Sequence, residues 1–174
     1  MRTYLSSQDG YTLIEVIISV AIGAILMTAL TSVVLTSVRA ANIASSRVEA
    51  SGQIRNFEYF AYDDFAGSAI PATSTCGTPA TPCTTEPIVL TGTAVSNSVP
   101  PVPAPRQVTY TWDGSDLLDR QVAGAPVHAA TGVTAFSWYV DSSAVLPTVV
   151  VNLTVTVQSY SESQTLLFYP RVNP

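Results

Sequence analysis

The sequence predicts an α+β protein in which one long N-terminal α-helix packs on a C-terminal antiparallel β-sheet. Three observations support this fold class. No proline occurs before Pro71, and apolar residues recur at helical spacing as far as residue 66. Residues 67–105 are rich in Pro, Thr and Ser, which is typical of a connection. Residues 106–174 contain segments with alternating or β-branched residues, and strands that follow a helix indicate an α+β arrangement.

The first half of the predicted helix, residues 11–66, is apolar on all sides. Residues 16–38 form a run of 23 residues without a charge, and a helix of that length extends about 35 Å. Such a run is long enough to cross the hydrocarbon core of a membrane, and it is too long for the apolar part of an ordinary secretory signal. We therefore expect a transmembrane helix over residues 12–38, with Glu15 as a single carboxylate near its start.

The second half of the predicted helix is amphipathic. Its apolar residues recur every three or four positions: Ile54, Phe57, Ala61 and Phe65. Such a stripe predicts that this half packs on a globular domain. We interpret Asp63 and Asp64 as a solvated pair at the end of the helix, because adjacent helical residues do not face each other.

The connection, residues 67–105, contains both cysteines of the chain, Cys76 and Cys83. In an oxidising compartment they would most simply form a disulfide that closes a short loop. The apolar N-terminus implies export and so favours the disulfide, and two free thiols are the alternative. We expect a short strand at "PIVLT" (residues 87–91) and polyproline II backbone at residues 100–105.

The last part of the chain, residues 106–174, is expected to form an antiparallel sheet. Residues 107–122 predict a hairpin whose turn lies at Asp113-Gly114. Residues 132–140 and 147–163 predict two further strands, and residues 165–172 predict the last one.

The N-terminus has a specific motif. A short polar leader, residues 1–10, ends in Gly10, Tyr11 follows directly, and Glu15 lies five positions after the glycine at the head of the apolar run. This order resembles the prepilin signal that type IV pilins share with type II secretion pseudopilins. The chain has Tyr11 where phenylalanine is commonest in that family, and Asp9 where a basic residue is usual.

The resemblance implies a pilin-like fold, a processing step and a set of partners. In that family a prepilin peptidase in the inner membrane cuts after the glycine on the cytoplasmic side, and the new N-terminal residue is methylated. Carried over, the cut falls between Gly10 and Tyr11, Tyr11 becomes N-methylated, and Glu15 becomes an assembly contact with other pilin subunits. The implied location is the bacterial inner membrane, with the C-terminal domain outside the cytoplasm, and a cell-surface filament after assembly.

Two later stretches resemble minor pilins of the J- or W-like group. The first is "FAYDDFAGSAI", which has an aspartate shortly before the predicted end of the helix. The second is the hairpin "VTYTWDGSDLLDRQV". The hairpin residues that fit that group's pattern are Tyr110, Asp113, Gly114, Leu117, Leu118 and Arg120.

The composition offers neither a nucleic-acid site nor a catalytic centre. A net charge of −5 and the absence of lysine argue against electrostatic binding of nucleic acid. The only histidine, His128, lies in a Gly/Ala/Pro region where neither a nucleophile nor a carboxylate can be placed beside it. Asp113, Asp116 and Asp119 would allow a calcium ion at a turn, but they lack EF-hand spacing, and turn chemistry explains them without a metal. We therefore expect no catalytic residue, no metal and no cofactor.

The expected function is structural: a minor pilin or pseudopilin that is cleaved and then enters or primes a type IV pilus or a type II secretion pseudopilus. The alternative is a membrane-anchored periplasmic or surface binding module that does not polymerise. An anchored enzyme has no supporting group of residues. The sequence leaves open whether the filament would serve a pilus, secretion or DNA uptake, and where in the filament the subunit would lie.

Overall fold

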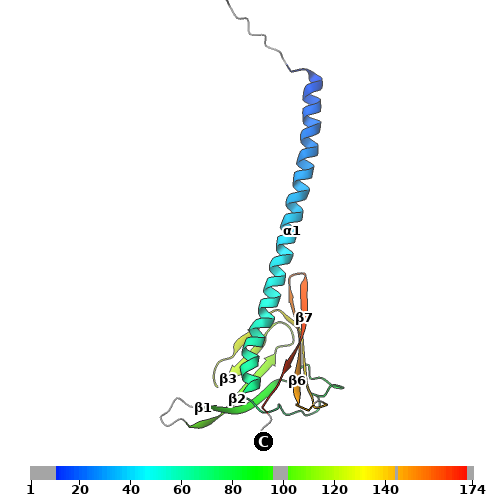
Figure 1. Cartoon of the computed structure of the whole chain (residues 1–174). Helices are drawn as coiled ribbons and strands as arrows, with labels where there is room; N and C mark the ends of the chain where they lie inside the picture. Colours follow the sequence, from blue (N-terminus) through cyan, green and yellow to red (C-terminus); the bar gives the residue numbers. More distant parts are fainter. Residues whose placement is uncertain (1–10, 96–101, 144, 172–174) are drawn as a thin grey trace, which may run out of the picture. The chain divides into compact units, whose positions relative to one another are not determined.

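The computed structural model describes residues 11–95, 102–143 and 145–171. In this part of the chain one long helix, α1 (Leu13–Ala66), precedes seven strands (Figure 1). The strands are β1 (Ile88–Val95), β2 (Pro103–Trp112), β3 (Leu118–Val122), β4 (Val127–Ala130), β5 (Val133–Asp141), β6 (Thr148–Val157) and β7 (Tyr160–Phe168). The predicted α+β class, with a long N-terminal helix followed by antiparallel sheet, is confirmed.

The chain divides into two compact units, and the boundary lies within α1 between residues 42 and 43. In the first unit, all of the described residues, 11–42, are exposed, and α1 is long and apolar enough to cross a membrane. Five hydroxyls of this segment donate to backbone carbonyls three or four residues earlier: Ser19, Thr28, Thr31, Ser32 and Thr36. Because each donor is satisfied within the helix, these residues do not oppose burial in lipid.

The second unit, from residue 43 onward, contains two antiparallel sheets. One has the strand order β1-β2-β3-β4 and the other the order β5-β6-β7. Within each sheet, strands that pair are consecutive in the sequence, so both sheets are built from consecutive hairpins. The hairpin between β6 and β7 closes at the pair Val157–Tyr160 around a two-residue turn, in which Gln158 has a φ of 55°.

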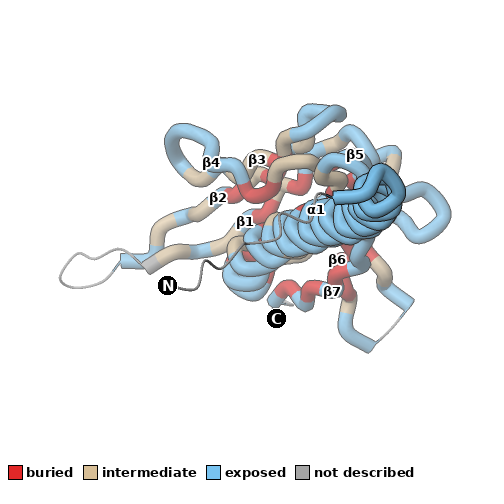
Figure 2. The backbone as a smooth tube through the Cα atoms, turned by 90° about the horizontal axis from the view of Figure 1, so that it is seen from above, coloured by how far each residue is buried: buried red, intermediate tan, exposed pale blue. Residues whose placement is uncertain are grey.

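The hydrophobic core of this unit lies where the second half of α1 meets both sheets. Ala50, Ile54, Phe57, Ala61 and Phe65 are buried and form the helix side of the core, so the predicted stripe is confirmed. Figure 2 shows buried residues, in red, on strands of both sheets. Full burial of a large apolar side chain stabilises a fold by about 1.5–3 kcal/mol.

An aromatic cluster connects α1 to the two sheets at the C-terminal end of the helix. Phe65 stacks on Phe168 of β7, with ring centroids 4.4 Å apart. Phe57 makes edge contacts with both Tyr110 of β2 and Phe168. Such ring pairs stabilise by about 0.5–1.5 kcal/mol beyond the burial of their area, so they help to hold the helix end against both sheets.

The expectation of polyproline II backbone was wrong. Residues 103–105 lie in β2 and pair with β1. A strand accepts proline at positions where the ladder needs no N–H donor. Residues 100 and 101 of the expected polyproline segment lie outside the described residues. The expected connection, 67–105, therefore contributes β1 and the start of β2 to a sheet. The strand β4 was not expected, since four residues between Gly/Pro-rich segments show no alternation.

At Gly92, β1 lies directly beside the residues that follow α1. Gly92 pairs with Ser68, and a Cβ added to it would lie 2.3 Å from the Gly67 carbonyl oxygen. We expect Gly92→Ala to destabilise the chain by about 1–3 kcal/mol, because backbone atoms must move. Gly52→Ala is the control: nothing lies within 4 Å of its added Cβ, and alanine favours helix by about 1 kcal/mol. Urea unfolding of the detergent-solubilised chain measures both, and equal stabilities would contradict the expectation.

Candidate functional site

The start of α1 is built by a helix cap. Gly10, at the predicted cleavage point, lies outside the described residues, as does the rest of the leader. Thr12 is the cap residue: its carbonyl accepts the amides of Glu15 and Val16, at 3.0 and 3.3 Å, and its Oγ1 lies 3.4 Å from the Glu15 nitrogen. Threonine followed three residues later by glutamate is the capping-box pattern. In the described structure Thr12 caps the backbone amide of Glu15, and the Glu15 carboxylate makes no return bond to the Thr12 amide.

The carboxylate of Glu15 is exposed, as is the neighbouring aromatic residue Tyr11. Within the described residues, no side chain forms a hydrogen bond or ion pair with this carboxylate. An unpaired carboxylate is costly in a membrane or among packed apolar helices. The arrangement can therefore accept a cation from outside the chain.

A buried carboxylate, Asp64, fixes the other end of α1 to the first sheet. Asp64 is 2% exposed. Arg120 of β3 donates to both of its oxygens, from Nε at 2.6 Å and from a terminal nitrogen at 2.8 Å. Arg106 of β2 donates to Oδ1 at 2.5 Å, and the Tyr110 hydroxyl donates to Oδ2 at 2.6 Å. The Arg120 guanidinium lies over the Phe60 ring, with its Cζ 5.3 Å from the ring centroid. These partners compensate a negative charge near the negative end of the helix dipole.

The protonation of this cluster follows from its hydrogen bonds. Burial alone would raise the pKa of Asp64, but the hydrogen bonds from Arg120 and Tyr110 and the charges of both arginines outweigh it and lower this pKa. The hydrogen bond to Asp64 raises the pKa of Arg120, and burial followed by the bond to Asp64 raises the pKa of Tyr110. The carboxylate and guanidinium are therefore charged and the phenol is neutral at ordinary pH.

The interpretation of Asp63 and Asp64 as a solvated pair was wrong for Asp64, while Asp63 is exposed. Asp64 follows Ala61 by three residues and Phe57 by seven, so it continues the buried stripe of the helix. That spacing was the signal in the sequence that could have identified it. Two of the hairpin residues singled out by resemblance, Tyr110 and Arg120, are partners of this carboxylate.

The three aspartates considered for calcium lie in the predicted hairpin turn (Asp113, Asp116) and on β3 (Asp119), and each carboxylate has a different partner. Asp113 Oδ1 accepts the backbone amides of residues 115, 116 and 117 at 2.8–3.0 Å. The bonds from the Asp116 and Ser115 amides lower the pKa of Asp113 to about 2. Asp116 Oδ1 accepts the Gly132 amide at 2.8 Å, which ties the turn to the start of β5.

The environment of His128 differs from the expectation. Strand β4 places its Nδ1 2.5 Å from Oδ1 of Asp119 on β3, so a carboxylate does lie beside the ring. The histidine side chain is 58% exposed. Among the residues that the structure describes, no hydroxyl or thiol is hydrogen-bonded to this ring.

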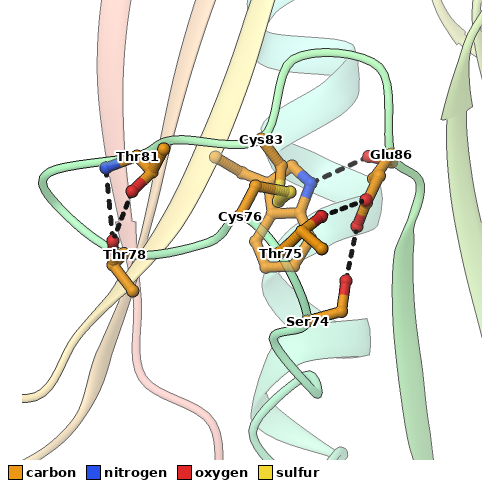
Figure 3. Close-up of a disulfide and its surroundings, with 8 residues drawn as sticks. Ser74, Thr75, Cys76, Thr78, Thr81, Cys83 and Glu86 are labelled. Carbon is orange, nitrogen blue, oxygen red and sulfur yellow. Dashed lines mark hydrogen bonds between the residues drawn. A yellow bond between two sulfur atoms is a disulfide. The ribbon is translucent and has the colours of Figure 1, made fainter.

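The two cysteines, Cys76 and Cys83, are joined in a disulfide, as the sequence analysis favoured (Figure 3). Cys83 is buried and Cys76 is partly exposed. Glu86 accepts hydrogen bonds from Ser74 at 3.0 Å and from Thr75 at 3.1 Å, beside the disulfide (Figure 3). Although Glu86 lies near both sulfur atoms, the bonded cysteines offer no thiolate to a metal.

Comparisons with known proteins identify the N-terminal segment. Residues 5–31 match the family model described as "Prokaryotic N-terminal methylation motif". The searches of the curated proteins and of the solved structures found no significant match. The matched motif and the apolar first half of α1 together support a type IV pilin-like protein with a membrane-anchoring helix.

Proposed function

We propose that the chain is a minor pilin or pseudopilin that a prepilin peptidase cleaves after Gly10 and that then assembles with other pilin subunits. One observation supports this most strongly: the matched methylation motif, residues 5–31, overlaps a helix that is exposed as far as residue 42 and has no charged residue from position 16 to position 38. An apolar helix needs either lipid or other helices around it. In this proposal, assembly moves the apolar helix from the lipid bilayer into a bundle of other subunits' helices.

Glu15 supplies the assembly contact in this proposal. Cleavage after Gly10 creates an N-terminal amine on Tyr11, which N-methylation leaves positively charged. The unpaired carboxylate of Glu15 on one subunit then pairs with the Tyr11 amine of the next subunit. In an apolar filament core, a paired charge is much less costly than two isolated ones, so the pair would fix the register between neighbouring helices.

The Asp64 cluster serves the same function by holding the globular unit on its helix. The two arginines and Tyr110 come from strands β2 and β3, while Asp64 comes from α1. The cluster therefore holds the first sheet on the second half of α1, within one unit. The domain would lie outside the cytoplasm, above the inner membrane.

Gly10→Val is expected to block cleavage, because a side chain at this position prevents access of the peptidase to the Gly10–Tyr11 bond. Co-expression with a prepilin peptidase should shorten the wild-type chain by its leader on an immunoblot and leave Gly10→Val at full length. Gln8→Ala is the control, since it changes the leader away from the bond. A Gly10→Val chain that is shortened like the wild type would refute the proposed processing and favour a plain membrane anchor.

A further inference from the structure

The outer edge of β5 is covered by the disulfide loop, which we define as residues 74–86. The Trp138 amide donates to the Cys83 carbonyl at 2.9 Å, and the Cys83 amide donates to the Trp138 carbonyl at 2.8 Å. Two residues further on, the Val140 amide donates to the Gly77 carbonyl at 2.9 Å. The loop therefore occupies the hydrogen-bonding positions that an additional strand would use.

Covalent and side-chain contacts hold this loop in place. The Cys76–Cys83 disulfide closes it, and Glu86 accepts from Ser74 and Thr75 at its base (Figure 3). The Trp138 indole N–H donates to the Glu86 carbonyl at 2.9 Å, which fastens the base of the loop to β5. Three backbone hydrogen bonds join residues 77–83 to β5 and three more close turns within the loop, and the disulfide is the covalent constraint that is added to them.

The opposite edge of the same sheet, β7, has no such cover. The pair Val157–Tyr160 closes the hairpin, so the even-numbered residues of β7 direct their backbone N–H and C=O groups toward β6. The odd-numbered residues direct these backbone groups away from the sheet. The outward residues are Ser161, Ser163, Thr165 and Leu167, and all four are exposed and uncharged. In the described part of the chain, no backbone hydrogen bond reaches them from outside the sheet.

The two edges are compatible with each other in neighbouring copies. Both β5 and β7 are antiparallel to β6, so they run in the same direction. Two copies that are oriented alike, as copies anchored in one membrane are, can therefore align β7 of one beside β5 of the next. This contact is head-to-tail and leaves a free edge at each end, so it can repeat without closing.

We propose that the disulfide loop is a redox-dependent cover that prevents β5 from pairing with β7 of a second copy of this chain. A dithiol thiolate attacks the partly exposed Cys76 sulfur, which breaks the Cys76–Cys83 bond and forms a mixed disulfide with the dithiol. The second thiol of the reagent then displaces Cys76, so the reagent becomes a cyclic disulfide and both cysteines become thiols. The reagent supplies two electrons and two protons. The released loop uncovers the Trp138 and Val140 backbone groups.

Amide hydrogen exchange of the detergent-solubilised full chain, with and without dithiothreitol, tests the release of the loop. We expect protection of Trp138 and Val140 to fall by about tenfold or more, because their amides bond to the loop. The intervening amides of Ser137 and Tyr139 bond to β6 and are the internal control. Unchanged protection at all four amides would overturn the proposal, and so would equal loss at all four, since the disulfide would then support the whole sheet.

Sedimentation of the same sample tests the second copy as the occupant. The reduced chain, and the Cys76→Ser/Cys83→Ser variant, should self-associate with increasing protein concentration, whereas the oxidised chain should not. Ser163→Pro removes an outward amide of β7 without breaking the ladder to β6, so it should abolish this association. Ser163→Ala keeps the amide and should associate normally. No association of the reduced chain, or equal association of Ser163→Pro and Ser163→Ala, would overturn the β5–β7 contact.

Discussion

Asp64→Ala is expected to destabilise the globular unit by about 3–5 kcal/mol, which is the usual cost of removing one partner from a buried ion pair. The variant leaves Arg120 with an 18% exposed side chain and no carboxylate, and it removes the acceptor of the Tyr110 hydroxyl. Arg106, at 32% exposure, recovers more of its hydration and adds less to the loss. Since domains are stable by only about 5–15 kcal/mol, this is a large part of the total.

The adjacent aspartate is the matched control for this variant. Asp63→Ala removes the same group from an exposed position on the same helical turn, so its effect should stay within about 0.5 kcal/mol. Urea unfolding of the full chain in detergent, followed by tryptophan fluorescence, compares the two variants at pH 7. Equal effects of the two substitutions would show that the Asp64 cluster does not stabilise the unit.

The Asp64 cluster also predicts the direction of the pH dependence. The pKa of Asp64 is lowered in the folded chain, so its contribution to stability is fully present above the unfolded value of about 3.9. That contribution is lost as the pH falls from about 4 through the lower folded value. Asp113 and Asp141, whose pKa values are also lowered, act in the same direction. Asp64→Asn should unfold with a shallower pH slope below pH 4 than the wild type, and an unchanged slope would contradict the assignment.

Glu15→Val is expected to leave membrane insertion and cleavage intact while preventing entry into filaments. The substitution removes the carboxylate that would pair with the Tyr11 amine of the next subunit, so that amine is left unpaired in an apolar core. Removing one partner of a buried pair costs about 3–5 kcal/mol per contact. Because a factor of ten in an equilibrium constant corresponds to about 1.4 kcal/mol, this cost is large enough to prevent assembly. Immunoblots of membrane and sheared-filament fractions should show the variant in the first fraction and not in the second.

A conservative variant separates this pairing from the helix cap. Glu15 is the third helical residue after Thr12, where either glutamate or glutamine can complete a capping box. Glu15→Gln therefore keeps the local helix start and removes only the charge. If pairing is the role of Glu15, the glutamine variant fails to enter filaments as the valine variant does. Normal entry of Glu15→Gln would contradict the charge pairing.

Local pattern was sufficient for the long helix and most strands. The absence of proline before Pro71 and the stripe that ends at Phe65 predicted α1, and the alternation after residue 147 predicted β6. The turn at Asp113-Gly114 was predictable because its chemistry is local, with Gly114 at a φ of 86°. These features depend on neighbours within a few residues, which a single sequence displays directly.

The buried Asp64 cluster depends on contacts that local pattern does not display. Its partners lie 42, 46 and 56 residues away, on two strands. Helical spacing placed Asp64 on the buried stripe. Burial of a charge without a partner is costly, however, and the sequence does not show which residues would pair with it. Strand β4 was missed for a related reason: its four residues form a strand because β3 lies beside them, as the His128–Asp119 contact shows.

Mass spectrometry of the N-terminal peptide of the chain, from purified filaments and from the membrane and soluble fractions, tests the central claim most directly. The account predicts a peptide that begins with N-methylated Tyr11, because cleavage after Gly10 and methylation must both precede the pairing with Glu15. A peptide that begins at Met1, or beyond residue 38, in a chain found only in the membrane or in a soluble fraction would contradict the account and identify an ordinary anchor or secretory signal.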